Sequence, residues 1–470
     1  MNRVRGACSS GARSNSSREH ILVTSVWRAP PLFILLAAAV VHAGAPPQAD
    51  APANVAAGAR ATARAHEPPR ATTPESVGFS SERLARLDRW MNDEIAQKRK
   101  AGAVVLIARH GRIAWEKAYG VADIASGEPM RTDAIFRLFS MTKPITSVAL
   151  LTLYEQGKFQ LTDPLERFIP AFKDVGVYAG VKPGGGVAVA VPKRKITIQD
   201  VFRHTAGFAY GGYFEDTPVD KAYQAAGIDY AKLDSLTELV NKLSAMPLLY
   251  EPGERWVYSF SHDVLAYLVE QLSGLPFDEY CRRTIFRPLG MHDTVFGMPP
   301  DRAARYPTAY KTDASGTLTA FTREQDVYPH FTSHPFGGAS LAASAEDYLR
   351  FAQMLLNGGE LNGVRILAPK TVELMRSDNL PPGTSYWAPG MRYGLGVSVL
   401  ADPAQAGIIG SKGEFGWPGA ASTWVGIDPT EDLVALVLTQ FLPRDVRFND
   451  EFQTMVYQAL IAPADASTRR

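Results

Sequence analysis

The sequence predicts an α+β fold, in which one antiparallel sheet is built from both ends of the chain, is flanked by helices and carries an inserted, mostly helical region. Strand-like runs occur near the start of the chain, at 103–108 and 113–119. They return near its end, at 423–427 and 433–440. The intervening residues have mostly helical periodicity. With 470 residues, the chain is long enough to enclose a large core.

The first 75 residues differ in composition from the rest. An apolar run at 32–41 follows several arginines and precedes Ala43-Gly44-Ala45, a small-residue cleavage site. The run is too short to span a bilayer, which takes roughly 20 residues. We therefore predict a signal peptide at 1–45 and a disordered linker, rich in Ala, Pro and Arg, at 46–75. The protein is expected to be exported, either periplasmic or secreted, and an uncleaved signal would instead hold it at the membrane.

Composition excludes several classes of function. The net charge is +1 and no long basic or acidic block follows the N-terminus, which argues against nucleic acid as a partner. The nine histidines include no His-Glu-x-x-His pattern and the cysteines no Cys-x-x-Cys, so no metal site is predicted. Cys8 precedes the predicted cleavage site, so the mature chain would carry Cys281 alone and no intramolecular disulfide.

The elements near the start of the chain follow from local patterns. Residues 81–95 have apolar side chains three or four positions apart, with Ser80 or Ser81 as the cap, which predicts a helix. The two strand-like runs that come next enclose the polar turn Arg109-His110-Gly111-Arg112 and predict a β-hairpin.

The middle of the chain holds most of the predicted helices. Thr197 is predicted to cap a short helix. Residues 261–272 form a longer one, with Ser261 as its cap and Gly274 just past its end. The segment 175–191, rich in Gly, Pro and Val, is predicted to be a loop. Further helices are predicted at 230–243, 344–356 and 370–376.

The end of the chain returns to strands. A run at 393–400 precedes the two strands already named, and a helix at 449–461 closes the chain. We therefore assign residues 76–165 and 335–465 to a sheet domain and residues 166–334 to an inserted helical domain.

Ser140 and Lys143 are spaced to lie on one face of a helix predicted at 142–154. This helix begins at or near Ser140, because Pro144 is tolerated only in a first turn. A lysine that is held unprotonated can take the proton of a serine hydroxyl and make it a nucleophile. Free N–H groups at the helix start, including that of Ser140, suit an oxyanion. The plainer alternative is a capping serine followed by lysine by chance.

Two later segments could complete such a site. Tyr258 lies just before a helix; near a lysine cation its phenolate would be favoured, and it could then exchange protons with a serine. Alternatively, its ring simply packs while the hydroxyl binds a carbonyl. In the run Trp417-Pro418-Gly419, the glycine would let a ligand approach the backbone, and the N–H of Ala420 could be a second oxyanion donor. An ordinary β-turn is the alternative interpretation.

Together these segments resemble the serine β-lactamase and penicillin-binding-protein superfamily, and most closely its esterase branch related to class C β-lactamases, the family VIII carboxylesterases. Ser140-Met141-Thr142-Lys143 resembles the nucleophile motif of that superfamily. Tyr258-Ser259-Phe260 resembles its Tyr-x-Asn motif, and Trp417-Pro418-Gly419 its Lys-Thr-Gly motif in the Trp-x-Gly form of some esterases. The resemblance runs from about Ser76 to Ile461 and implies a β-lactamase-like fold.

The sequence departs from the β-lactamase pattern in the residues that hold a β-lactam. Phe260 stands where β-lactamases have an amide-bearing Asn, and Trp417 where they have Lys or His. The lost groups make charge-assisted hydrogen bonds to a carboxylate and an amide in those enzymes. Trp417 offers an apolar wall instead, so an ester is the implied substrate, contacted by Trp417, Gly419 and Phe260. Lys412 could replace the missing cation, although a solvated loop lysine is the plainer interpretation.

The resemblance implies a serine hydrolase that acts on carboxylic esters through an acyl-enzyme. Ser140 would be the nucleophile, Lys143 and Tyr258 the base network, and the N–H groups of Ser140 and Ala420 the oxyanion donors. The segment around His204 has a structural role in the superfamily. No cofactor or metal is implied, and a small-molecule ester or amide is the expected partner. The alternatives are a β-lactamase or D-Ala-D-Ala carboxypeptidase, and a non-catalytic protein of the same fold that binds the cell wall or a partner.

Overall fold

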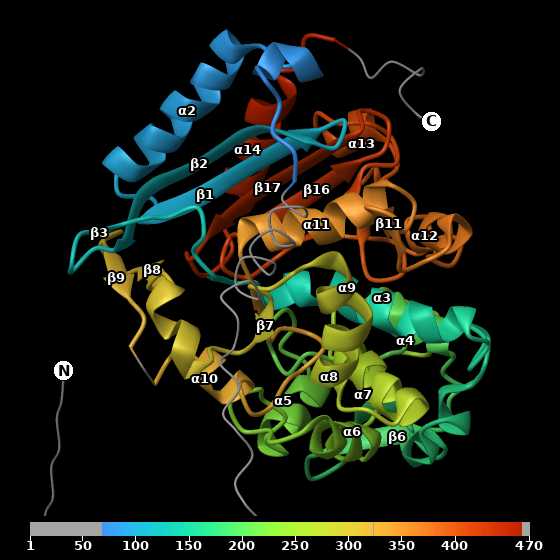
Figure 1. Cartoon of the computed structure of the whole chain (residues 1–470). Helices are drawn as coiled ribbons and strands as arrows, with labels where there is room; N and C mark the ends of the chain where they lie inside the picture. Colours follow the sequence, from blue (N-terminus) through green and yellow to red (C-terminus); the bar gives the residue numbers. More distant parts are fainter. Residues whose placement is uncertain (1–67, 323, 463–470) are drawn as a thin grey trace, which may run out of the picture. The chain divides into compact units, whose positions relative to one another are not determined.

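The computed structural model describes residues 68–322 and 324–462 (Figure 1). The predicted signal peptide and residues 46–67 of the predicted linker lie outside the described residues. The end of that predicted linker is ordered, because Arg70 forms a β-bridge with Ile113. Within the described part of the chain, no helix combines the length and the apolar character needed to cross a membrane.

The central sheet has eight strands, each antiparallel to its neighbours, which confirms the predicted α+β architecture. Their order is β13-β14-β15-β16-β17-β1-β2-β3, so the two ends of the chain meet where β1 pairs with β17. The bounds are β1 Gly102–Arg109, β2 Arg112–Asp123, β3 Glu128–Pro129, β13 Met391–Tyr393, β14 Ser398–Leu400, β15 Phe415–Pro418, β16 Trp424–Asp428 and β17 Leu433–Thr439.

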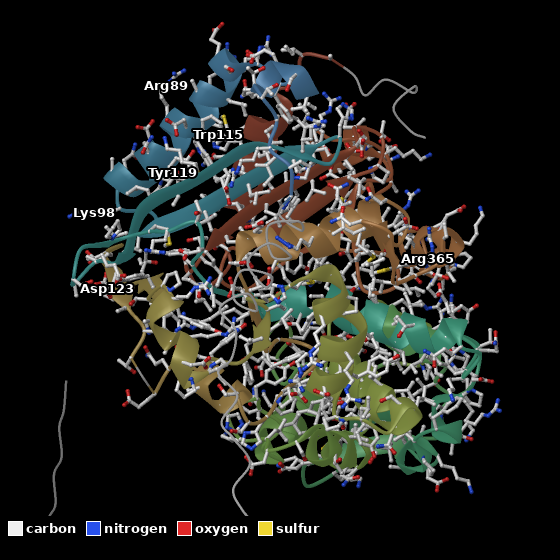
Figure 2. All side chains as sticks on the ribbon, in the orientation of Figure 1. Arg89, Lys98, Trp115, Tyr119, Asp123 and Arg365 are labelled. Atoms are coloured by element: carbon white, nitrogen blue, oxygen red, sulfur yellow. The ribbon has the colours of Figure 1, made fainter. Side chains whose placement is uncertain are left out.

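Helices cover both faces of this sheet, which explains why β1 and β17 are continuous apolar runs that are buried at every position. α2 (Ser81–Ala96) and α14 (Val446–Tyr457) lie on one face, and α11 (Ala345–Leu356) on the other (Figure 1). Trp115 and Tyr119 project from β2 into the layer beneath α2 (Figure 2).

A helical region lies below the sheet in Figure 1, and α3 forms its boundary with α11. α3 is almost fully buried and packs against α7. The helices of this region are α3 Thr142–Glu155, α4 Ile198–Phe202, α5 Pro218–Ala225, α6 Leu236–Ser244, α7 Ser261–Ser273, α8 Phe277–Cys281, α9 Arg287–Leu289 and α10 Tyr328–Phe331. Two short helices, α12 Pro369–Met375 and α13 Pro403–Ala406, lie later in the chain. The predicted domain boundaries at 165 and 335 stay a prediction.

Short strands tie the loops together. A three-stranded sheet joins β4 Phe136–Arg137, β10 Leu341–Ala343 and β7 Val295–Phe296, and so connects the segment before Ser140 to the segment after residue 340. The remaining two-stranded pairs are β5 Val177–Val181 with β6 Val187–Ala190, β8 Tyr310–Thr312 with β9 Leu318–Ala320, and β11 Glu360–Leu361 with β12 Val364–Arg365.

The structure confirms several predicted helix caps. Ser80 Oγ accepts the N–H of Arg83 at the start of α2, and Thr197 caps α4 by accepting the N–H of Asp200. Gly274 ends α7 in the left-handed conformation, with φ of 72°. The prediction for Ser261 is wrong, because it is the first residue of α7 rather than its cap.

Three other predictions are wrong in detail. The predicted loop 175–191 contains the hairpin β5–β6, whose strands flank a glycine turn. The helix predicted at 230–243 begins at Leu236, because Ser235 caps it by accepting the N–H of Glu238. The predicted strand 393–400 is two short strands, β13 and β14, joined by a turn.

Candidate active site

Ser140 lies in a single 3₁₀ turn, Phe139–Met141, that leads directly into α3. Phe139 has a φ of 46°, in the left-handed region that non-glycine residues avoid. Its surroundings hold it there: the N–H of Phe139 donates to the Tyr328 hydroxyl at 2.7 Å, and Thr142 Oγ1 donates to the Phe139 carbonyl at 2.6 Å. This turn leaves Ser140 partly exposed in a cavity, while Met141 behind it is buried.

The structure brings the three predicted catalytic side chains together. The Tyr258 hydroxyl donates to Ser140 Oγ at 2.7 Å, although the two residues are 118 positions apart. Lys143 Nζ lies 3.4 Å from the same oxygen. The Lys143 amine also lies 4.5 Å from the centre of the Tyr258 ring. The serine oxygen therefore has both a phenol and an amine within reach.

Lys143 is fully buried, and burial lowers the pKa of its amine to about 7, while the charge of Asp263 opposes that change. Nζ donates to the Gly338 carbonyl at 2.7 Å. The N–H of Gly338 donates to Asp263 at 2.8 Å, so the backbone of this one residue links Lys143 to Asp263. A Cβ at 338 would lie 2.4 Å from the Tyr230 hydroxyl, which explains the glycine. An amine in this setting is partly neutral at pH 7 and can accept a proton.

Asp263 was not among the predicted site residues. Burial raises the pKa of its carboxyl to about 6, and the charge of Lys143 lowers it. The Tyr230 hydroxyl donates to Asp263 at 2.8 Å. Asp263 does not line the cavity, and its charge acts on the site by raising the pKa of Lys143 and that of Tyr258.

Tyr258 differs from the expected state. Burial raises the pKa of its phenol well above the usual value, and this effect exceeds the lowering by its hydrogen bond to Ser140. The phenol therefore keeps its proton at neutral pH, and the expectation of a phenolate next to a lysine cation is wrong. As a protonated group 2.7 Å from the nucleophile, Tyr258 is placed to donate a proton.

The histidines near the site serve as packing. His204 and His262 lie 4.8 Å apart, and His204 lies 4.8 Å from the Tyr258 ring. Burial lowers the pKa of both imidazoles well below the usual value, so both are neutral. His204 Nδ1 is 3.1 Å from Ser259 Oγ, and His204 does not reach the cavity.

A cavity of about 1110 Å³ opens over Ser140 and Tyr258. Trp417 forms part of its wall and stacks on Trp387, with ring centres 5.5 Å apart. Gly419 and Ala420 line the cavity as well. A Cβ at 419 would lie 2.3 Å from the Leu138 carbonyl, so glycine is required for β15 to approach the turn that carries Ser140. The remaining aromatic residues of the wall are Tyr213, Phe214, Phe321, Tyr386, Phe415 and Trp424.

Two predicted residues lie elsewhere. Phe260 is 1% exposed, packs against Tyr210 and Tyr230, and is not part of the cavity wall, so the prediction that it contacts substrate is wrong. Phe260 is the residue just before α7, and at this position its side chain lies in the core rather than in the cavity. Lys412 is exposed in a turn outside the cavity wall, in agreement with the solvated interpretation.

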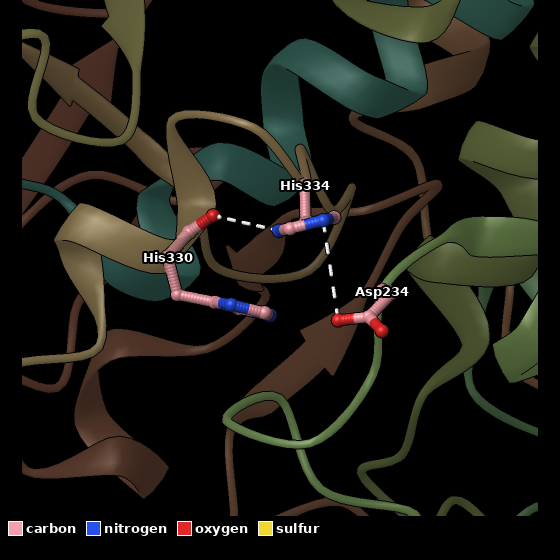
Figure 3. Close-up of side chains that lie close together, drawn as sticks. All are labelled: Asp234, His330 and His334. Carbon is pink, nitrogen blue, oxygen red and sulfur yellow. Dashed lines mark hydrogen bonds and ion pairs between the residues drawn. The ribbon is translucent and has the colours of Figure 1, made fainter.

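One cluster in the described part of the chain has the residue types of a metal site. Ligand atoms of Asp234, His330 and His334 all lie within 4.8 Å of one another (Figure 3). His330 Nε2 is 2.7 Å from the Leu233 carbonyl and His334 Nδ1 is 3.1 Å from the His330 carbonyl, so each ring already uses one nitrogen. The two rings stack 4.3 Å apart, and none of the three residues lines the cavity.

Comparisons with known proteins find relatives over most of this chain. A family model described as Beta-lactamase matches residues 87–459. The chain is 35% identical over 359 residues to Protein Rv1367c of Mycobacterium tuberculosis, which covers 73% of this chain and 86% of that protein. It is 32% identical over 378 residues to Esterase EstB of Burkholderia gladioli, which covers 76% and 90%. The solved structure of EstCE1, a hydrolase with promiscuous acyltransferase activity, has a TM-score of 0.69 and 27% identity, and the match covers 80% of this chain and 99% of that one.

Proposed function

Because this chain belongs to the β-lactamase family, we propose that it is a serine hydrolase that cleaves carboxylic esters through an acyl-enzyme on Ser140. One observation carries the proposal: Ser140 Oγ accepts a hydrogen bond from a protonated phenol at 2.7 Å and lies 3.4 Å from a buried amine. A nucleophile with a base on one side and an acid on the other has what both halves of ester cleavage need.

Acylation begins when neutral Lys143 takes the proton of the Ser140 hydroxyl as Oγ forms a bond to the ester carbonyl carbon. The carbonyl oxygen becomes an oxyanion, to which the N–H groups of Ser140 and Ala420 donate; loss of one such donor typically costs about 100-fold or more in rate. The bond to the alcohol oxygen then breaks, and the departing alkoxide takes the Tyr258 proton. The Lys143 ammonium, which lies beside the Tyr258 ring, then returns its proton to the Tyr258 phenolate, so charges balance.

Deacylation repeats these steps with water. Water attacks the acyl carbon and passes its proton to the same network, the Ser140–acyl bond breaks, and Ser140 Oγ regains its proton. The acid product leaves, and the amine and phenol return to their resting states. Only groups of the chain, the substrate and the attacking water take part in these proton transfers.

The cavity wall favours an ester over a β-lactam. Trp417 and Trp387 form an apolar surface beside the nucleophile, and an apolar acyl or alcohol group would bury against it. The similarity to Esterase EstB supports the same choice.

The test is turnover of short-chain p-nitrophenyl esters by the purified protein, in parallel with nitrocefin. We expect ester turnover to exceed nitrocefin turnover and to fall by at least about 1000-fold in Ser140→Ala, with the fold retained by circular dichroism. Preferential nitrocefin turnover would instead favour the β-lactamase or carboxypeptidase alternative. Unchanged ester turnover in Ser140→Ala would refute the assignment. Failure of a fluorophosphonate probe to label Ser140 in the wild type would favour the non-catalytic alternative.

We also propose that the protein is exported, on the signal-peptide pattern at 1–45. N-terminal sequencing of the mature protein tests this: a start after residue 45 supports export, and a start at Met1 in the cytosolic fraction contradicts it.

A further inference from the structure

Two basic side chains line the active-site cavity and take no part in the chemistry above, Lys311 and Arg444. They differ in position. Arg444 lies in the connection between β17 and α14, close enough to the site that its positive charge lowers the pKa of Tyr258. Lys311 lies over the Phe321 ring, 5.2 Å from its centre. Of these two basic residues in the cavity wall, Arg444 is therefore the one whose charge acts on the catalytic residues.

The charge of Arg444 is balanced only in part, because the nearby carboxylates of Asp450 and Asp445 act on it without a direct ion pair. Its Nε donates to Asn449 Oδ1 at 2.8 Å, and it forms no ion pair with any carboxylate of the described residues. Burial lowers the pKa of Arg444, and the charge of Asp450 opposes this, but an arginine keeps its proton throughout the working range. A partly buried guanidinium therefore faces the cavity with hydrogen-bond donors to spare.

The acidic groups nearby are engaged or distant. Asp445, the next residue, accepts from Lys100 at 2.8 Å and caps α14. Asp450 lines the cavity as an exposed residue and lies beyond ion-pair distance of Arg444. Glu414 also lines the cavity, but burial raises the pKa of its carboxyl to about 8, so it is mostly uncharged at pH 7. Among the described residues, therefore, no carboxylate forms an ion pair with Arg444, and its guanidinium can still bind one.

A carboxylate is the ligand group that best matches the guanidinium of Arg444. The guanidinium is planar and presents paired N–H donors that match the two oxygens of a carboxylate. Apolar surface of Tyr386 and Leu442 lines the same cavity, and a less polar setting strengthens such a pair. A neutral alcohol or alkyl group would leave the buried cation without a partner, and this has a cost.

We propose that Arg444 is a specificity-determining residue that binds a carboxylate carried by the ester substrate away from the scissile bond. The natural substrates are then anionic esters, either monoesters of dicarboxylic acids or esters of hydroxy acids. This inference rests on the ester hydrolysis proposed above, and it places the carboxylate site on the loop before α14 rather than on β15, where Trp417 stands.

Two matched substrate pairs test it with the full chain. On the acyl side, p-nitrophenyl hydrogen glutarate is compared with its neutral methyl ester. On the alcohol side, 4-acetoxybenzoate is compared with methyl 4-acetoxybenzoate. We expect kcat/KM to favour the anionic member of at least one pair by about tenfold or more, and the pair that responds tells which side of the ester carries the charge.

The variants separate specificity from a general effect on the site. Arg444→Gln should reduce the anionic-to-neutral ratio to about one, and Arg444→Lys should keep part of it. Arg447→Gln, which changes an exposed arginine three residues later in α14, should leave the ratio unchanged. The ratio is the readout, because loss of the charge near Tyr258 can shift both rates together. No anion preference in either pair, or a preference that survives Arg444→Gln, overturns the proposal. If neither neutral ester is hydrolysed, the ester function itself fails.

Discussion

Glu414 makes the stability of this protein depend on pH in a way that one substitution should remove. Tyr457 Oη lies 2.9 Å from Glu414 Oε2 and 2.6 Å from Asp428 Oδ2. A phenol has one proton and can donate to one of these oxygens, so the other contact requires a protonated carboxyl. Gln453 Nε2 lies 2.9 and 3.0 Å from the two oxygens of Glu414. Glu414→Gln should reproduce the protonated acid, with its amide N–H₂ donating to Tyr457.

The magnitude follows from the pKa of Glu414, which burial and the charge of Asp428 raise from 4.5 to about 8. A raised carboxyl pKa means that the folded state holds the proton more tightly than the unfolded chain. The stabilisation that comes from protonated Glu414 is therefore complete below pH 4.5 and is lost as the pH rises through about 8. Each pH unit in this window costs the wild type about 1.4 kcal/mol of unfolding free energy, or up to about 5 kcal/mol across it.

Urea unfolding of the wild type and Glu414→Gln between pH 5 and 8.5 measures this directly. We expect the difference in unfolding free energy to grow with pH in favour of the variant. Taking the difference cancels other titrating groups, such as Lys143. Glu373→Gln, an exposed glutamate that pairs with Lys370, is the matched control and should follow the wild type. Parallel curves for wild type and Glu414→Gln would refute the reasoning.

Three further predictions concern the active site. Because burial lowers the pKa of Lys143 to about 7 and the neutral amine is the base, kcat/KM for a neutral ester should rise with pH through about 7; a profile that falls there contradicts the assigned role. Tyr258→Phe should slow alkyl esters by about 100-fold or more and p-nitrophenyl esters much less, since p-nitrophenolate leaves without a proton; equal losses for both would argue against proton donation. Gly419→Ala should lower turnover by about 100-fold, because its Cβ would lie 2.3 Å from the Leu138 carbonyl and displace Ala420; an unaffected rate in a folded variant would show that this contact is not needed.

Local elements could be predicted from sequence because their signals are local. Ser80 and Ser344 begin their helices by accepting N–H groups three residues ahead, and the apolar run of β17 needs no distant partner to be recognised. The hairpin β5–β6 was missed because its turn is a run of glycines between short, half-exposed strands, which is also the pattern of a loop.

The site was predictable where a motif named its residues and not where the fold alone assembles them. No local pattern in the sequence between Ser140 and Tyr258 predicts that the Tyr258 hydroxyl lies 2.7 Å from Ser140 Oγ. The resemblance to a family predicted that these two residues share a site. Asp263 and Arg444 belong to no such motif. The fold places Asp263, in α7, near Lys143, and it places Arg444, in the connection after β17, in the cavity wall. Phe260 shows the reverse error, since a motif position was predicted to contact substrate while the start of α7 turns that side chain into the core.

Mass spectrometry of the trapped intermediate tests the central claim most directly. The protein is mixed with p-nitrophenyl acetate, quenched in acid within milliseconds to seconds, and analysed intact and after digestion. We predict an acetyl adduct on the peptide that contains Ser140, released on a timescale that matches turnover and absent from Ser140→Ala. Ester turnover with no adduct at any quench time, or an adduct that maps to another residue, would contradict the account.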